Sequence, residues 1–199
     1  MSSKPVLAVD FDDTLANFAQ GMAEAYNAEV KESGGETVTP QDFYIVWKVG
    51  VPAHGWNHDR VAADQWIAHY LFSDRALGTP PIDGSVEVIY RLKEKYDIHV
   101  VTGRDVEMRQ ATEQWIEKYF PGVFKGIHFE VLKAVACKQI DAVAIVDDAP
   151  PYIAATVSAG IRSICFGDYA WNDESQIPHG AEKARDWYEV ERLLMGDEQ

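Results

Sequence analysis

The chain has 199 residues, of which 47% are hydrophobic and 25% charged, a balance that predicts an ordinary soluble globular protein. A formal net charge of -14 argues against the basic surface that binding to duplex nucleic acid or to an anionic membrane requires. The apolar runs are too short to cross a bilayer and no signal peptide is visible, so we expect a reducing, cytoplasmic location.

Five short apolar runs, rich in β-branched residues, predict the buried strands of a parallel sheet. They are residues 6–9, 98–101, 127–129, 142–146 and 163–166. Helical patterns lie between them, at residues 86–96, 108–120, 133–140 and 151–159, and a last amphipathic helix is expected over residues 181–194. This alternation predicts an α/β fold with a doubly wound, Rossmann-like sheet of about five strands and helices on both faces. Cys137 and Cys165 fall in a predicted helix and a predicted strand, which suits packed, reduced thiols.

Roughly 80 residues separate the first two strands, far more than a crossover connection needs. We therefore expect an α/β core over residues 1–16 and 80–199, with a helical cap inserted as residues 17–79. The cap is rich in aromatic side chains: Phe43, Tyr44, Trp47, Trp56, Trp66, Tyr70 and Phe72. They can form the core of a small cap or stack on a nucleobase, and the sequence leaves both interpretations open. His54, His58 and His69 lie nearby, but their spacing matches no metal site.

Carboxylates follow two of the predicted strands directly. Asp10, Asp12 and Asp13 come after the first strand, and Asp147 and Asp148 after the fourth. Crowded carboxylates at a strand end repel one another and need a cation, a shared proton or hydrogen bonds. Because the carboxyl ends of parallel strands are where α/β proteins bind ligands, we expect these acids to meet in one site.

The second strand ends in Thr102, Gly103 and Arg104, which offers a hydroxyl and turn N–H groups suited to phosphate oxygens. Thr102 by itself is also a plausible helix cap, and Arg104 is expected to be a surface cation. A lysine precedes the fourth strand. We favour Lys133 over Lys138, because Lys133 begins its predicted helix and faces the strand ends, whereas Lys138 is more than one turn further along.

This order of motifs resembles the haloacid-dehalogenase-like (HAD) superfamily: DxDxT from Asp10 to Thr14, a strand ending in Thr102, a lysine, and then Asp147-Asp148. The resemblance covers residues 4–16 and 82–168 and is greatest to the 5′(3′)-deoxyribonucleotidase-like branch. It implies a nucleophilic Asp10 that forms an aspartyl-phosphate, and an Asp12 that acts as general acid and then general base.

The resemblance also assigns the groups around the phosphate and the metal. Thr14, Thr102, Gly103 and Lys133 would position or bind the phosphate. Mg²⁺ would be held by Asp10, the backbone carbonyl of Asp12, and one of Asp147 and Asp148, with family alignment favouring Asp148 as the direct ligand. Two features depart from the family pattern, because Asp13 stands where many relatives have glycine and no further acid follows Asp148 closely.

The expected function is a Mg²⁺-dependent phosphatase acting on a small phosphorylated metabolite, with nucleotide monophosphates as the first class to test. A phosphomutase with the same nucleophile and a catalytically weak HAD-fold binding or regulatory protein are the alternatives. Dehalogenase chemistry is disfavoured, since it needs neither Asp12 nor the Asp147-Asp148 pair. The sequence does not fix the substrate or the oligomeric state.

Overall fold

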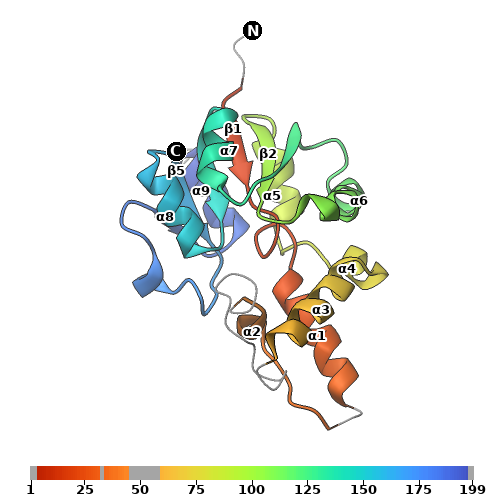
Figure 1. The fold of residues 1–199 in the computed structure, drawn as a ribbon. Coiled ribbons are helices and arrows are strands. Elements are labelled where there is room, and N and C mark those ends of the chain that lie inside the picture. The colour runs from red at the N-terminus through yellow and green to blue at the C-terminus, as the bar shows by residue number, and fades with distance from the viewer. Residues whose placement is uncertain (1–3, 32–33, 45–58, 197–199) are drawn as a thin grey trace. The chain divides into compact units, whose positions relative to one another are not determined.

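The computed structural model describes residues 4–31, 34–44 and 59–196, and the chain divides into two compact units (Figure 1). The first unit consists of residues 1–16 and 81–199, and the second of residues 17–80. None of the helices in the described ranges has the length and apolarity needed to cross a bilayer.

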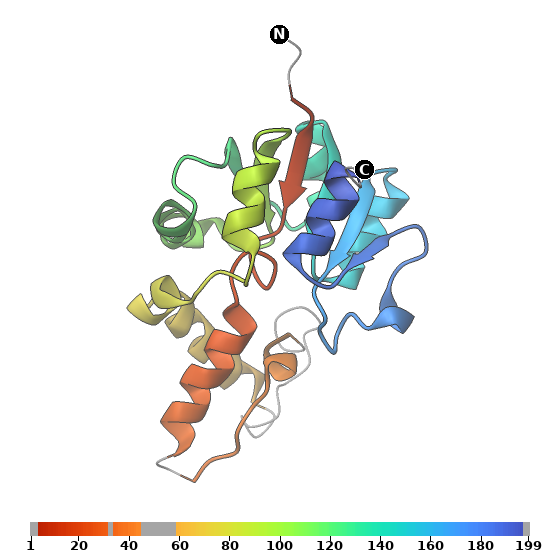
Figure 2. The same cartoon turned by 180° about the vertical axis from the view of Figure 1, so that it is seen from behind.

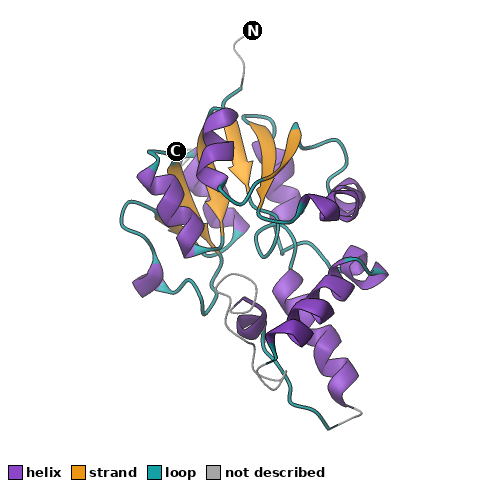
Figure 3. Cartoon of the chain, viewed as in Figure 1, coloured by secondary structure: helices purple, strands orange, loops and turns teal. Residues whose placement is uncertain are grey.

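The first unit is built on one parallel sheet with helices on both faces (Figure 3), which confirms the Rossmann-like α/β fold. Its strands lie in the order β3-β2-β1-β4-β5-β6. Their bounds are Val6–Val9 (β1), Asp97–Thr102 (β2), Gly126–Phe129 (β3), Ala142–Asp147 (β4), Arg162–Phe166 (β5) and Glu182–Ala184 (β6). β1 therefore lies between β2 and β4, the two strands whose ends carry the other expected site residues.

The sheet has six strands where the sequence predicts about five. The prediction of one continuous helix over residues 181–194 is wrong at its start, where the chain forms the sixth strand. Glu182 begins β6, which pairs with β5, and its carboxylate accepts a hydrogen bond from Arg162 Nε at 2.6 Å. Helix α9 (Trp187–Met195) begins only after Asp186, whose Oδ1 accepts the Glu189 N–H at 2.8 Å. A strand of three residues with two charged side chains gives no apolar run, so hydrophobic periodicity could not reveal it.

The remaining helices of this unit connect the strands. They are α5 (Ser85–Leu92), the 3₁₀ turn η2 (Val106–Met108), α6 (Arg109–Tyr119), α7 (Lys133–Gln139), α8 (Pro150–Ser158) and the 3₁₀ turn η3 (Glu174–Gln176). Helices α7 and α8 cover one face of the sheet, and α5 and α9 cover the other (Figures 1 and 2). The two layers bury the strands on both sides, as their apolar sequences require.

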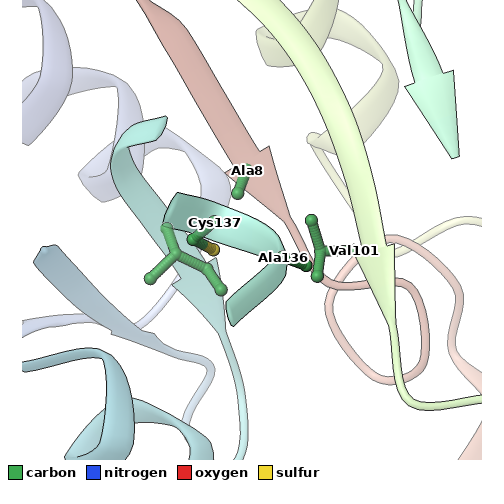
Figure 4. Packing of buried hydrophobic residues seen from close by; sticks show 5 residues of the cluster. Ala8, Val101, Ala136 and Cys137 are labelled. Atoms are coloured by element: carbon green, nitrogen blue, oxygen red, sulfur yellow. The ribbon is translucent and has the colours of Figure 1, made fainter. Parts of the chain in front are cut away.

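Small side chains bring α7 close to the sheet (Figure 4). Ala136 and Cys137 of this helix pack in one cluster with Ala8 of β1, Val101 of β2 and Ile145 of β4, and all five are at most 2% exposed. A helix without bulky side chains on its inner face approaches a sheet closely. The close approach places Lys133, the first residue of α7, at the ends of β1 and β4.

Both cysteines are free, buried thiols, and they lie on the predicted elements, Cys137 on α7 and Cys165 on β5. Burial raises the pKa of each thiol to about 12. The thiols are therefore protonated and unreactive in the folded protein at neutral pH.

The second unit is helical, with α1 (Phe18–Lys31), α2 (Pro40–Tyr44), α3 (Arg60–Leu71) and α4 (Asp74–Gly78). Several of its described aromatic residues pack in its own core: Phe43 is fully buried, and Trp66 stacks on Tyr70 with ring centroids 5.5 Å apart. Phe72 is 56% exposed. Trp47, Trp56, His54 and His58, which the sequence places in the same cap, lie outside the described residues.

Candidate active site

Asp10 continues the line of β1 at the carboxyl edge of the sheet. Its N–H donates to the carbonyl oxygen of Val146 in β4 at 2.9 Å, and the residue is only 1% exposed. The hydrogen bond extends the parallel β1–β4 ladder by one residue, which sets Asp10 beside Asp147, the last residue of β4. The two carboxylates meet because strand pairing brings them together.

Lys133 joins these two acids. Its Nζ lies 2.6 Å from Asp10 Oδ1 and donates to Asp147 Oδ2 at 2.5 Å, and its side chain is 1% exposed. The ammonium group also lies over the ring of Tyr152, 4.4 Å from the centroid. Lys138, the other lysine of α7, is exposed to solvent. One buried cation is thus shared between two buried carboxylates, an arrangement that offsets part of the cost of desolvating the three charges.

Asp148 completes a cluster of three buried carboxylates. One oxygen from each of Asp10, Asp147 and Asp148 lies within 4.8 Å of the others. Carboxylates this close repel one another and favour a cation between them, and hard divalent cations prefer oxygen ligands. The cluster could therefore hold a metal ion.

Asp147 and Asp148 have different surroundings. Asp147 accepts hydrogen bonds on both oxygens, from the Ala149 N–H to Oδ1 at 2.9 Å and from Lys133 to Oδ2. Asp148 Oδ2 accepts instead from the indole Nε1 of Trp171 at 2.9 Å. The ammonium of Lys133 thus donates to Asp147, and the indole N–H of Trp171 donates to Asp148.

The carboxylate of Asp12 faces Arg104. The guanidinium donates from Nε at 3.1 and 3.0 Å to the two oxygens, and from a terminal nitrogen to Oδ1 at 2.7 Å. Arg104 also donates to Thr112 Oγ1 at 3.1 Å and lies over the ring of Phe11, 4.5 Å from the centroid. At 4% exposure, Arg104 is not the surface cation expected from the sequence. Its position two residues after Thr102, at the same strand end, was the signal that could have placed it in the site.

The loop after Asp10 is tightly folded. Asp13 adopts a left-handed conformation with φ 58°, where glycine is favoured and aspartate is tolerated, so the loop keeps the conformation that a glycine would supply. Its carbonyl oxygen accepts the Tyr169 hydroxyl at 2.8 Å. The next residue, Thr14, is fully buried, and its carbonyl accepts the Trp187 indole N–H at 2.9 Å.

Thr102 and Gly103 form the turn at the end of β2. Thr102 is fully buried, and its Oγ1 accepts the backbone N–H of Arg104 at 3.2 Å. Thr102 is not the cap of the following turn, because Asp105 Oδ1 accepts the Glu107 N–H at the start of η2. At Gly103 a Cβ atom would lie 3.1 Å from the Tyr152 hydroxyl, so a side chain there would be crowded.

The segment after β5 also reaches the site, although none of its residues was among the expected site residues. Tyr169 contacts Asp13, and Trp171 contacts Asp148. Asn172 donates to the carbonyl of Asp148 at 2.7 Å. Burial raises the pKa of Tyr169 well above its usual value, so its hydroxyl stays protonated and able to donate. Polar aromatic residues in the loop that follows β5 were the available signal.

A family model described as 5′ nucleotidase, deoxy (Pyrimidine), cytosolic type C protein matches residues 4–199. No curated protein matches the sequence significantly.

Solved structures share the fold at low sequence identity. A haloacid dehalogenase-like hydrolase from Streptococcus pneumoniae is 16% identical with a TM-score of 0.68, covering 98% of this chain and 100% of its own. A HAD hydrolase from Bacillus subtilis, bound to magnesium, is 16% identical with a TM-score of 0.67 and covers 97% and 99%. A protein described as a putative β-phosphoglucomutase from Bacteroides vulgatus is 16% identical with a TM-score of 0.66. The match covers 97% of this chain and 88% of that protein.

The family model extends over almost the whole chain, and the fold and the order of motifs agree with it. The chain therefore belongs to the 5′ nucleotidase, deoxy (Pyrimidine), cytosolic type C family, and it is a HAD-like phosphoric monoester hydrolase.

Proposed function

We propose that this chain is a magnesium-dependent phosphatase that hydrolyses a small phosphomonoester through an aspartyl-phosphate on Asp10. One observation carries the proposal: Lys133 bridges Asp10 and Asp147 at the sheet edge, with Asp148 in the same buried carboxylate cluster. A nucleophilic carboxylate needs positive charge beside it to approach a phosphate dianion. Asp10 is the carboxylate here, and Lys133 supplies the positive charge.

In the first step, an Asp10 oxygen attacks phosphorus, the bond from phosphorus to the leaving oxygen breaks, and Asp12 gives that oxygen a proton. In the second step, water attacks the phosphorus of the aspartyl-phosphate, Asp12 takes its proton, and the Asp10–phosphorus bond breaks. Lys133 offsets the charge of the nucleophile and of the phosphoryl group. Thr102, Gly103 and Thr14 line the phosphoryl position, consistent with the burial of both threonines.

The metal ion would be held by Asp10, Asp148 and the backbone carbonyl of Asp12. When bound, it would neutralise charge between the nucleophile and the phosphate. Asp147, with a hydrogen bond on each oxygen, would orient Lys133 and not ligate the ion directly. This division gives each acid of the Asp147-Asp148 pair a separate role.

We propose a nucleoside monophosphate as the substrate, and pyrimidine deoxynucleotides as the first to test, because the description of the matching family names that class. Two buried, free thiols suit a reducing compartment, and we expect the enzyme to act in the cytoplasm.

The test is phosphate release from p-nitrophenyl phosphate and from a panel of nucleotide and sugar phosphates, with Mg²⁺ and with EDTA. Asp10→Asn is the matched variant. We expect Mg²⁺-dependent release that the variant lacks, with the highest kcat/KM on a pyrimidine deoxynucleotide. Isomerisation of a sugar phosphate without net phosphate release would instead support a phosphomutase. Tight ligand binding that survives Asp10→Asn, without turnover, would support a binding protein.

A further inference from the structure

We propose that Trp171 is a positioning residue that sets the orientation of the Asp148 carboxylate toward a divalent cation. The inference rests on the proposed magnesium-dependent function, and it assigns a role to a residue outside the HAD motifs. The observations that carry it concern how Trp171, Tyr169 and Asn172 are held.

The indole of Trp171 is itself fixed in position. It is 3% exposed and stacks on Tyr169, with ring centroids 4.3 Å apart and an interplanar angle of 9°. Tyr169 is in turn held by the hydrogen bond from its hydroxyl to the Asp13 carbonyl. A buried ring stacked on a half-buried neighbour has little freedom to rotate, so the indole N–H keeps its direction.

The backbone of Asp148 is held by the same segment. Asn172 Nδ2 donates to the carbonyls of Asp148 and Phe166, each at 2.7 Å. Lys183 of β6 donates to the Asn172 carbonyl at 2.7 Å and to its Oδ1 at 2.8 Å. With the main chain fixed by Asn172 and one carboxylate oxygen fixed by Trp171, the rotation of the Asp148 side chain is determined.

The chemistry of the donor also suits a metal ligand. Lys133 brings positive charge to Asp147, whereas an indole N–H orients Asp148 and adds no charge to it. An indole N–H therefore orients the carboxylate without bringing a charge of its own. Outer hydrogen bonds of this kind generally contribute roughly 10- to 100-fold to metal affinity or activity.

The test is Mg²⁺ affinity without substrate, measured by titration calorimetry on the full chain. Trp171→Phe keeps a stacking ring and removes the N–H donor, and we expect it to raise the Kd for Mg²⁺ by roughly 10- to 100-fold. Trp66→Phe is the matched control, because it removes an indole donor to a carboxylate, Glu29 at 2.8 Å, within the other unit. We expect its Mg²⁺ affinity to equal that of the wild type.

Phosphatase assays on the same proteins separate the two proposals. Equal Mg²⁺ affinity in folded Trp171→Phe and wild type would overturn the role of Trp171, even if the enzyme hydrolyses phosphomonoesters. Weakened Mg²⁺ binding in a chain that hydrolyses none would support Trp171 and refute the phosphatase. A wild type that binds no Mg²⁺ would overturn both.

If Trp171→Phe does not fold, the wild type still provides the answer. The indole N–H resonance of Trp171, assigned by its contacts with Tyr169 in ¹⁵N-tryptophan-labelled protein, should shift when Mg²⁺ is added. An unchanged resonance at saturating Mg²⁺ would count against the proposal.

Discussion

The Lys133 ammonium lies 2.6 Å from Asp10 Oδ1, and both side chains are 1% exposed. Burial removes both charges from bulk water, so each depends on the other, and Asp147 stabilises the Lys133 ammonium as well. Buried pairs of this kind add little net stability over an apolar pair, but losing one partner is costly, because the other charge stays buried.

Lys133→Met should therefore destabilise the Mg²⁺-free protein by about 3 to 5 kcal/mol, the usual cost of breaking a buried ion pair. It should also lower kcat by roughly 10²- to 10³-fold, as expected when one group that stabilises transition-state charge is removed. Urea denaturation in EDTA and phosphate release with Mg²⁺ measure the two effects. Lys138→Met, on the exposed side of the same helix, should change stability by less than about 0.5 kcal/mol. If the two substitutions had equal effects on stability and kcat, Lys133 would not form the buried ion pair with Asp10 that stabilises the site.

Arg104→Met should reduce turnover most for substrates with poor leaving groups. Arg104 holds the Asp12 carboxylate with a forked set of hydrogen bonds, and Asp12 is the proposed proton donor to the leaving oxygen. An alkyl phosphate needs that proton, so its kcat should fall by roughly 10²-fold or more, the usual contribution of a general acid. p-Nitrophenyl phosphate releases a stable phenolate and should lose much less.

The comparison of the two substrates distinguishes Arg104 from a purely structural residue. Arg104→Lys keeps the charge but not the forked geometry and should show the same pattern to a smaller extent. Arg109→Met removes an exposed cation of α6 that pairs with Glu113, and it should leave both substrates unaffected. A uniform loss across leaving groups in Arg104→Met would show that Arg104 does not act through Asp12.

The sequence was sufficient to predict which strand ends carry the acids and that these ends share one edge of the sheet, whereas the strand order that makes β1 and β4 neighbours comes from the structure. The β1 and β4 segments are short apolar runs that end in acids, and in a parallel sheet the ends of such strands lie at one edge, so Asp10 and Asp147 were expected together. Lys133 could be placed because a residue at the start of a helix faces the strand ends.

Contacts made by side chains from distant segments could not be predicted in this way. Arg104 and Asp12 are 92 positions apart, and Trp171 and Asp148 are 23 apart. Packing decides their directions: Arg104 lies over Phe11, and Trp171 lies on Tyr169. Local periodicity reports whether a side chain is buried, but not which buried partner it meets. The polar edge strand β6 was missed because it carries no such periodicity.

At position 13, glycine should give a more stable protein than alanine, whereas in the middle of a helix alanine gives the more stable protein. Asp13→Gly and Asp13→Ala both remove the carboxylate and differ only in the Cβ atom, which is unfavourable at the positive φ of this residue. Asp13→Gly should be more stable by about 1 kcal/mol in urea denaturation. At Glu113, in the middle of α6, alanine should instead be more stable than glycine by about 1 kcal/mol. The same preference at both positions would show that the left-handed conformation of Asp13 is not maintained.

The stability of the fold should decrease in mild acid because of a histidine pair at the edge of the sheet. His99 Nδ1 of β2 and His128 Nε2 of β3 are 3.0 Å apart, and the rings are stacked. Burial lowers the pKa of both imidazoles below 6.5; for His99, the neighbouring His128 and Lys125 lower it further, and Asp97 opposes them. The unfolded chain therefore takes up protons near pH 6.5, where the folded protein does not. Stability is complete above that pH and falls as the pH drops through 6.5 toward the lowered pKa values.

The measurement is the unfolding free energy from urea denaturation at pH 7.5, 6.5 and 5.5. His128→Gln removes one of the two imidazoles. It also removes the neighbour that lowers the pKa of His99, so stability should decrease less steeply with falling pH than in the wild type. His179→Gln changes an exposed histidine and should leave the wild-type slope intact. Because other groups titrate in the same range, the difference between the two variants is the informative quantity. Identical slopes for His128→Gln and the wild type would mean that the pair takes up protons equally in the folded and unfolded states, against the expectation from its burial.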